Sequence, residues 1–318
     1  MKKLLLYILL VLTPLIVVAL INIYIDSKSY FSSRYSERLA EEINNTPVSI
    51  HSEPEFRLVI KKLIELNKGK HFNKIVLGSS RAMQIGTPIG ERVLNISVSG
   101  AVLEDYEKLL ALVDSNSITY DTLEISAHGW LFNRNNGDHR YYLYDKKAGL
   151  DSIKKAFSWE YFWDNMNPNK YEPWDGNDKD FVVYPDGTIR YDIKYRNQVP
   201  DVEHHVEQAL IWPFKDYYEI DDDYKARFEN ILNKISKDHV IELVLLPYHP
   251  AVYNELITKI PIIDQAENYY KSIHKDNVIV IGSYNPEKLG VEAKDFYDPN
   301  HLNEEGLIKM FKHEKVRN

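Results

Sequence analysis

The pattern of apolar and polar positions divides the chain into three parts. An uncharged, mostly apolar run covers Leu4–Ile25. Residues 26–55 are polar and show no sustained apolar period, so we expect a stalk or linker there. From residue 56 onward, short apolar runs alternate with amphipathic stretches. The pattern therefore predicts a separate N-terminal segment over 1–25, a linker, and one large domain over 56–318.

Within the large domain, apolar runs of strand length alternate with stretches of helical period. Strands are predicted at 74–77, 93–98, 122–126, 240–246 and 277–281, and helices at 55–67, 102–113, 225–235, 263–273 and 303–312. This alternation is typical of an α/β fold, a three-layer sandwich with a parallel sheet and helices on both faces. Binding and catalytic groups of such sheets gather beyond the carboxyl ends of the strands.

One long stretch, at about 134–220, departs from the alternation. It is rich in aromatic and turn residues and holds four of the five tryptophans, at 159, 163, 174 and 212. Residues 181–195 place Pro185-Asp186-Gly187 between two β-rich arms, which predicts a hairpin. A stretch this long inside a domain is usually functional or a subdomain, so we expect an aromatic-rich insert.

Composition excludes several kinds of function. The net charge of −8 and the lack of a long basic cluster argue against a nucleic-acid surface. The chain has no cysteine, which excludes a disulfide, a thiolate zinc site and a cysteine nucleophile. No histidine spacing resembles the zinc-binding helix motif. We expect no metal and no cofactor.

The N-terminal run has the length of a membrane span. Lys2 and Lys3 precede 22 uncharged residues, and about 20 helical residues cross a bilayer core. A cleaved signal peptide is the alternative, but its apolar core is usually shorter and small residues mark its cleavage site. The lysines before the run place the N-terminus in the cytoplasm. We therefore expect a single-pass membrane anchor and an extracytoplasmic domain.

Two polar segments lie where this fold carries its chemistry. The first predicted strand leads into Gly78-Ser79-Ser80-Arg81, a turn that can lift a serine hydroxyl above the sheet edge. Ser80 is the preferred nucleophile and Ser79 the alternative. Near the last helix, Asp298 and His301 are three residues apart in a proline-containing loop. A serine needs a base to take its proton, and the base needs a group to orient it. Each segment alone is a weak signal, since a structural turn or a surface histidine also fits.

The order and placement of these segments resemble the SGNH/GDSL hydrolase superfamily, over roughly 70–130 and 240–313. The family's G-D-S block corresponds to Gly78-Ser79-Ser80, with Ser79 at the usual Asp position. Envelope members that act in teichoic-acid D-alanylation or polysaccharide O-acetylation share the G-S-S form. The resemblance implies a flavodoxin-like sandwich, a triad of Ser80, His301 and Asp298, and an oxyanion hole built from the N–H groups of Ser80 and Gly100.

The chain departs from the family at its third block, G-x-N-D, which is missing. Ser126 or His128 could supply the third oxyanion donor, and His128 is preferred. Trp130, Arg81 and His249 are candidate substrate contacts, although Arg81 at a helix start and His249 after the fourth strand also suit structural roles. Losing one oxyanion donor lowers the rate by roughly 10²–10³.

The resemblance and the anchor together predict an extracytoplasmic serine esterase or O-acyltransferase that acts on a cell-envelope polysaccharide or teichoic acid. The resemblance also implies a multi-span acyl-exporting membrane protein as a candidate partner. Two alternatives stay open. One is a catalytically degenerate protein of the same fold that binds glycan or scaffolds an envelope complex, and the other is an esterase of small lipids.

Overall fold

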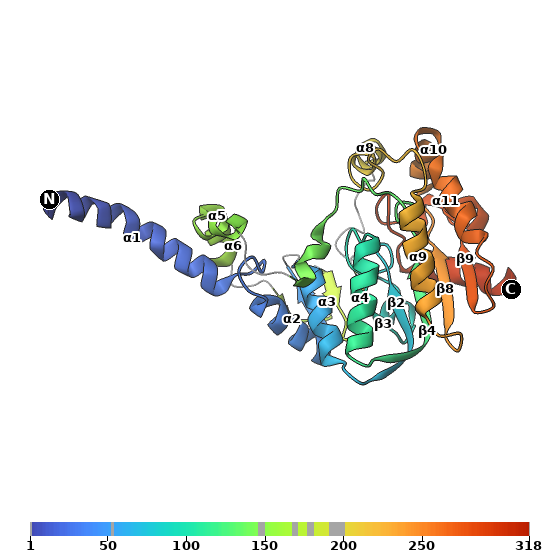
Figure 1. Ribbon diagram of the computed structural model, residues 1–318, viewed down its shortest axis with the longest axis horizontal. Coiled ribbons are helices and arrows are strands. Elements are labelled where there is room, and N and C mark those ends of the chain that lie inside the picture. Colours follow the sequence, from blue (N-terminus) through green and yellow to red (C-terminus); the bar gives the residue numbers. More distant parts are fainter. Residues whose placement is uncertain are drawn as a thin grey trace.

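The computed structural model describes residues 2–51, 54–145, 150–166, 171–176, 181–190 and 201–317, with the backbone alone at 2–9, 11, 150–152 and 314–317 (Figure 1). Five strands form one sheet in the order β3-β2-β4-β8-β9, and every neighbouring pair is parallel. The strands are β2 (His71–Leu77), β3 (Leu94–Asn95), β4 (Thr119–Ser126), β8 (Val240–Leu245) and β9 (Val278–Gly282). The prediction of an α/β fold with a five-stranded parallel sheet is confirmed.

Apolar side chains cover both faces of this sheet, which makes three layers. On one face Leu123 and Ile125 of β4 belong to the largest buried cluster. That cluster also takes in side chains from α3 (Phe56–Leu66), α4 (Leu103–Ser115), α9 (Asp222–Lys234), α10 (Pro250–Lys259) and α11 (Ile262–Lys271). On the other face Val76 and Val244 pack against α12 (Glu304–Arg317) and the loops before it. The strands are apolar on both sides because helices or loops cover both faces.

The stretch expected to be a linker is folded, so that prediction is wrong. It contains α2 (Arg34–Asn45) and β1 (Val48–Ile50). Leu39, Ala40 and Ile43 of α2 are fully buried and cluster with side chains of α3. Apart from the partly buried Tyr35, only these few positions of the helix are apolar, and β1 has its partners far along the chain. A search for a long local apolar period therefore misses both elements.

The partners of β1 lie in the aromatic-rich insert. A second, antiparallel sheet has the order β5-β1-β6-β7, with β5 (Tyr171–Pro173), β6 (Phe181–Val183) and β7 (Ile189–Arg190). The predicted hairpin is confirmed as far as residue 190, and 191–195 lie outside the described residues. Gly187 at its turn has φ +83°, and any side chain there would strike the carbonyl of Asn95. The insert also contains α5 (Leu150–Ala156), α6 (Trp159–Met166) and α8 (Val202–Ile211).

The N-terminal run forms a single helix, α1 (Lys2–Ile25), which projects away from the sheet with α5 and α6 beside it (Figure 1). Within the described part of the chain, none of the helices has both the length and the apolar character required for a membrane crossing. The end of α1 leads through a turn at Asp26, whose carboxylate accepts hydrogen bonds from the N–H groups of Tyr30, Phe31 and Ser32.

Candidate active site

Ser80 stands on a tight turn at the carboxyl end of β2. Gly78 allows this turn because a side chain there would lie 2.6 Å from the Cβ of Ala82 and 2.7 Å from the Cβ of Ser126. The N–H groups of Ala82 and Met83 donate to the carbonyls of Ser79 and Ser80, at 2.9 and 3.3 Å. The sequence G-S-S thus carries the chain around the strand end in a short, well-bonded turn.

The structure brings Ser80, His301 and Asp298 together in a hydrogen-bonded chain. The hydroxyl of Ser80 lies 2.9 Å from Nε2 of His301, and Nδ1 of His301 lies 2.7 Å from Oδ2 of Asp298. A carboxylate only accepts, so Nδ1 carries the proton and Nε2 is left to accept from the serine hydroxyl. Residues 221 positions apart in the chain thereby form the hydrogen-bond pattern of a serine nucleophile with its base.

The loop around Asp298 fixes the direction of its carboxylate. Oδ1 accepts hydrogen bonds from the N–H groups of Asn300 and His301, at 2.7 and 2.8 Å, so Oδ2 faces the imidazole. Burial opposes the charged form, but the charge and hydrogen bond of His301 and the two N–H groups outweigh it and lower the pKa of Asp298. The ring of Tyr297 stacks on His301 at 5.5 Å between centroids. Asp298 is therefore an anion near neutral pH, and the imidazole is held on one face.

Ser79, the alternative nucleophile, occupies a different environment. It is 1% exposed, and its hydroxyl accepts from the N–H of Arg81 at 3.4 Å. Its own N–H donates to Nε2 of His128 at 3.2 Å. The histidine of the Asp298 loop bonds to Ser80, so the geometry favours Ser80 as the nucleophile.

Gly100 lines the same cavity as Ser80 and sits in a loop held by two arginines. Its φ is +63°, and a side chain there would collide with the carboxylate of Asp138 and lie 2.7 Å from Nη2 of Arg140. The guanidinium of Arg140 donates to the carbonyl of Ser99 at 2.9 Å. The Gly100 N–H donates to no other group within the described ranges, which leaves it available to a ligand in the cavity.

The buried ion pair of Arg57 and Asp105 packs beneath the Gly100 loop, where Arg57 also donates to the carbonyl of Gly100. Arg57 is fully buried and donates to both carboxylate oxygens of Asp105, at 2.8 and 2.9 Å. The same carboxylate accepts the N–H of Val102 at the start of α4. Asp138 is 3.8 Å from Arg57 and pairs with Arg140. Burial opposes ionisation of Asp138, but the bond to Arg140 and the charge of Arg57 lower its pKa.

Arg81 does not face the cavity, so its expected substrate contact is corrected to a structural role. It is 3% exposed, and its guanidinium donates to the carbonyls of Asn300, Leu246 and Pro247, at 3.2, 2.6 and 2.5 Å. The guanidinium carbon Cζ of Arg81 lies over the ring of Tyr248, 4.0 Å from the ring centroid. Burial lowers the pKa of Arg81. The side chain ties the Ser80 turn to the end of β8 and to the His301 loop.

His128 is fully buried and its Nε2 already accepts the N–H of Ser79. Nε2 is therefore not available to donate to an oxyanion, and Nδ1 is buried in a side chain that does not line the cavity, so the preference for His128 as the third donor is corrected. Burial, with the nearby charges of Arg81 and His301, lowers the pKa of His128 well below its ordinary value. Ser126, the other candidate, is also buried, at 1% exposed.

Of the two other expected substrate contacts, only Trp130 lines the cavity. Its ring stacks on His128 at 4.3 Å, and its N–H donates to the carbonyl of Ala101 at 3.1 Å. His249 instead caps the start of α10, where its Nδ1 accepts the N–H of Ala251 at 3.3 Å. Burial lowers its pKa. The expected substrate contact of His249 is thus corrected to a helix cap.

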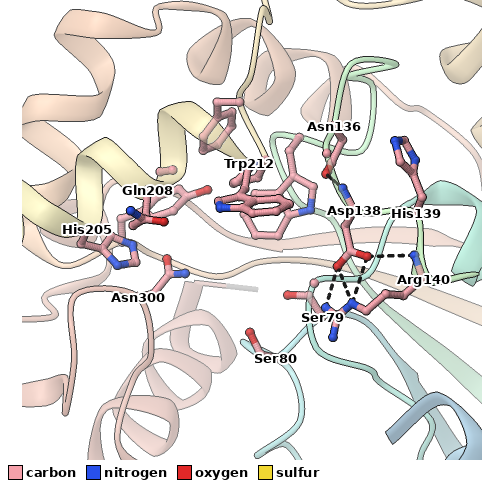
Figure 2. Close-up of a pocket in the computed structure, with 17 residues that line it drawn as sticks. Ser79, Ser80, Asn136, Asp138, His139, Arg140, His205, Gln208, Trp212 and Asn300 are labelled. Carbon is pink, nitrogen blue, oxygen red and sulfur yellow. Dashed lines mark hydrogen bonds and ion pairs between the residues drawn. The ribbon is translucent and has the colours of Figure 1, made fainter. Parts of the chain in front are cut away.

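The cavity above Ser80 measures about 560 Å³ and most of its lining comes from the insert (Figure 2). The insert residues that sequence reasoning missed are Asn136, Gly137, Asp138, His139, Arg140, His205, Gln208, Ala209, Trp212, Pro213 and Phe214. Figure 2 places the ring of Trp212 across the middle of the cavity, with Asp138 and Arg140 on one side and His205 and Asn300 on the other. Burial lowers the pKa of His205 to about 4, so it is neutral near pH 7.

No protein-family model, no curated protein and no solved structure matches this chain.

Proposed function

We propose that the protein is an extracytoplasmic serine esterase or O-acyltransferase of the SGNH kind. The hydrogen-bonded chain from Ser80 through His301 to Asp298 is the observation that carries this proposal. Two observations support it: Ser80 lies at the carboxyl end of β2, an interior strand of the parallel sheet, and a cavity opens above it.

The proposed reaction proceeds in two halves. Nε2 of His301 takes the proton of Ser80 while Oγ attacks an ester carbonyl, and the N–H groups of Ser80 and Gly100 stabilise the resulting oxyanion. The imidazolium then gives its proton to the leaving alcohol, and the acyl group stays on Ser80. In the second half, His301 activates water or a sugar hydroxyl, which takes the acyl group and releases the serine. Water makes the protein an esterase, and a sugar hydroxyl makes it a transferase.

The proposed acceptor or substrate is a cell-envelope polysaccharide or teichoic acid. Aromatic rings often stack on sugars, and the cavity offers Trp130, Trp212 and Phe214. The lysines and the uncharged run at the N-terminus support a single-pass anchor that holds the catalytic domain outside the cell membrane. A multi-span acyl-exporting membrane protein is the proposed donor partner, on the strength of the family resemblance alone.

Trapping of the acyl intermediate tests this proposal. The full chain is mixed with p-nitrophenyl acetate, quenched in acid and analysed by peptide mass spectrometry. We expect an acetyl group on the peptide that contains Ser80, and none in Ser80→Ala or His301→Ala. Ser79→Ala is the matched control and should still acetylate at Ser80, because its hydroxyl bonds only weakly to the N–H of Arg81. Acetylation that persists in Ser80→Ala would refute the mechanism.

A further inference from the structure

A polar network fastens the end of α1 to the α5–α6 pair of the insert. Asn22 is fully buried, and its amide donates to the carbonyls of Lys155, Ala156 and Ser158, at 3.2, 2.8 and 3.0 Å. Its Oδ1 accepts from the amide of Asn165 at 3.1 Å. These bonds satisfy the buried amide and fix α5 and α6 at one level along α1.

A second set of bonds holds the same junction at the turn after α1. The hydroxyl of Tyr161 donates to Asp26 at 2.8 Å, and Oδ1 of Asn165 accepts from both the N–H and the hydroxyl of Ser27, at 3.0 and 2.7 Å. Lys28 pairs with Asp164 at 2.7 Å. At least four side chains therefore hold the α5–α6 pair in a fixed position against residues 22–28.

Several large apolar side chains of this docked pair are exposed. Trp163 is 66% exposed and Trp159 is 51% exposed. Ile153, Phe157 and Met166 are each about half exposed. Exposed apolar side chains also occur along α1, among them Leu12, Ile16, Val17, Leu20, Ile23 and Tyr24. We call these exposed side chains of the α5–α6 pair the aromatic collar; it consists of Ile153, Phe157, Trp159, Trp163 and Met166.

With the uncharged N-terminal run as the proposed anchor, the collar falls near the boundary of the bilayer. At 1.5 Å per residue, the uncharged run from Leu4 to Ile25 extends over roughly 33 Å, close to the ~30 Å of a hydrocarbon core. The collar docks where this run ends, beside Asn22 and the turn at Asp26. Tryptophan and tyrosine are the residues enriched at that depth, because their rings are apolar and their N–H and O–H groups reach water.

From this arrangement we infer that the aromatic collar is a membrane-surface element that inserts into the headgroup and upper acyl region of the bilayer. The inference rests on the anchor in the proposed function and extends it, because it assigns a lipid contact to the catalytic domain's own insert. The collar adds a second attachment beside α1, and the polar network keeps the two at a constant separation. The domain is then held by two points on the membrane instead of swinging from one helix.

Quenching by brominated lipid tests the collar. The full chain is reconstituted into phosphatidylethanolamine–phosphatidylglycerol vesicles whose acyl chains carry bromine near the headgroup, and flotation confirms incorporation. We expect bromolipid to quench a large part of the tryptophan fluorescence of the wild type, and most of that quenching to disappear in Trp159→Phe/Trp163→Phe. The matched control is Trp174→Phe; Trp174 follows β5 and packs against Tyr184 beside the second sheet, so this variant should keep the quenching.

The alternatives give different results. If acrylamide in the buffer quenches Trp159 and Trp163 while bromolipid does not, the collar lies in water and the inference is wrong. If neither quencher reaches them, a second copy or another protein covers the collar, which also overturns it. Failure of the chain to float with the vesicles would count against the anchor itself. Acetylation of Ser80 is measured separately, so failure of the catalytic proposal is distinguishable from each of these results.

Discussion

Replacement of Asp298 by asparagine tests the logic of the site through a change that keeps its shape. Oδ1 of Asp298 accepts two backbone N–H groups, and Oδ2 faces Nδ1 of His301. In Asp298→Asn, the two N–H donors select the carbonyl oxygen of the introduced amide for the Oδ1 position. Its NH₂ group then points at Nδ1 of His301, and Nδ1 has to accept. The ring proton moves to Nε2, which can no longer take the proton of Ser80.

The structure sets the size of this effect. Rotating the introduced amide to restore the original tautomer breaks two hydrogen bonds and opposes NH₂ to two N–H donors, which costs roughly 2–3 kcal/mol. This favours the inactive tautomer by about 30- to 150-fold, since 1.4 kcal/mol is a factor of ten. The variant also lacks the carboxylate charge that stabilises the imidazolium in the transition state. Together these losses predict a fall in kcat on the order of 10⁴.

Steady-state hydrolysis of p-nitrophenyl acetate measures this change, with circular dichroism and thermal unfolding as controls for the fold. The low pKa of Asp298 means that its charged form adds stability above the ordinary pKa of an aspartate, and this contribution is lost as the pH falls through the lowered pKa. The variant should therefore be somewhat less stable than the wild type at pH 7 and differ less in acid. Activity within about tenfold of the wild type would show that the tautomer of His301 does not control the reaction.

Three further changes test the supporting structure. Gly100→Ala should lower kcat for the same ester by roughly 10²–10³ while the fold survives, because φ +63° and the collision with Asp138 displace an oxyanion N–H; an unchanged kcat would exclude Gly100 from the oxyanion hole. Arg81→Met should lower the free energy of unfolding by roughly 2–4 kcal/mol, since three buried carbonyls lose their donor; urea titration measures this, and a stability change below 1 kcal/mol would contradict it. Glu124→Gln tests the buried carboxyl in the sheet, where burial raises the pKa to about 7 despite Lys74. Wild-type stability should fall as the pH rises from about 4.5 to 7, because the folded state retains a proton that the unfolded state releases, by up to about 3 kcal/mol. The variant should lack that decline in urea titrations at pH 5 and 8, and an equal decline in both proteins would refute the assignment.

The parts of the fold that sequence patterns predicted well are those with local signals. All five strands of the parallel sheet carry apolar runs, and the hairpin has the turn residues Pro185, Asp186 and Gly187 between its arms. The grouping of Ser80, Asp298 and His301 could also be predicted from the sequence. Ser80 follows the end of one strand, and Asp298 and His301 precede the last helix. The topology of a parallel sheet brings these positions to the same edge. These features depend on chain order and residue type, which the sequence contains.

The parts that sequence analysis missed depend on contacts between distant segments. The pairing of β1 with β5 and β6 joins residues more than 120 positions apart, so residues 26–55 looked like a linker. Arg81 and His249 look functional by type and place, but backbone carbonyls and a helix start occupy their polar groups. His128 is turned to an N–H of the neighbouring turn. Tertiary packing decides whether a given histidine nitrogen or guanidinium group faces a cavity. A local sequence pattern does not contain that information.

The residues of the insert that line the cavity could not be predicted from the sequence either. Its aromatic composition suggested a functional subdomain, yet composition does not distinguish Trp212, which crosses the cavity, from Trp159 and Trp163, which are exposed on α6. His205 had no signal beyond its residue type, and its place beside Asn300 follows from the docking of α8 over the site.

Fluorophosphonate labelling of the full chain tests the central claim most directly, because such a probe reacts with a serine only when a base activates it. The account predicts that the wild type is labelled at Ser80, that Ser80→Ala and His301→Ala are not, and that Ser79→Ala still is. A folded wild type that resists the probe, or a label that survives in Ser80→Ala, would contradict the proposal that Ser80, His301 and Asp298 form a working catalytic triad.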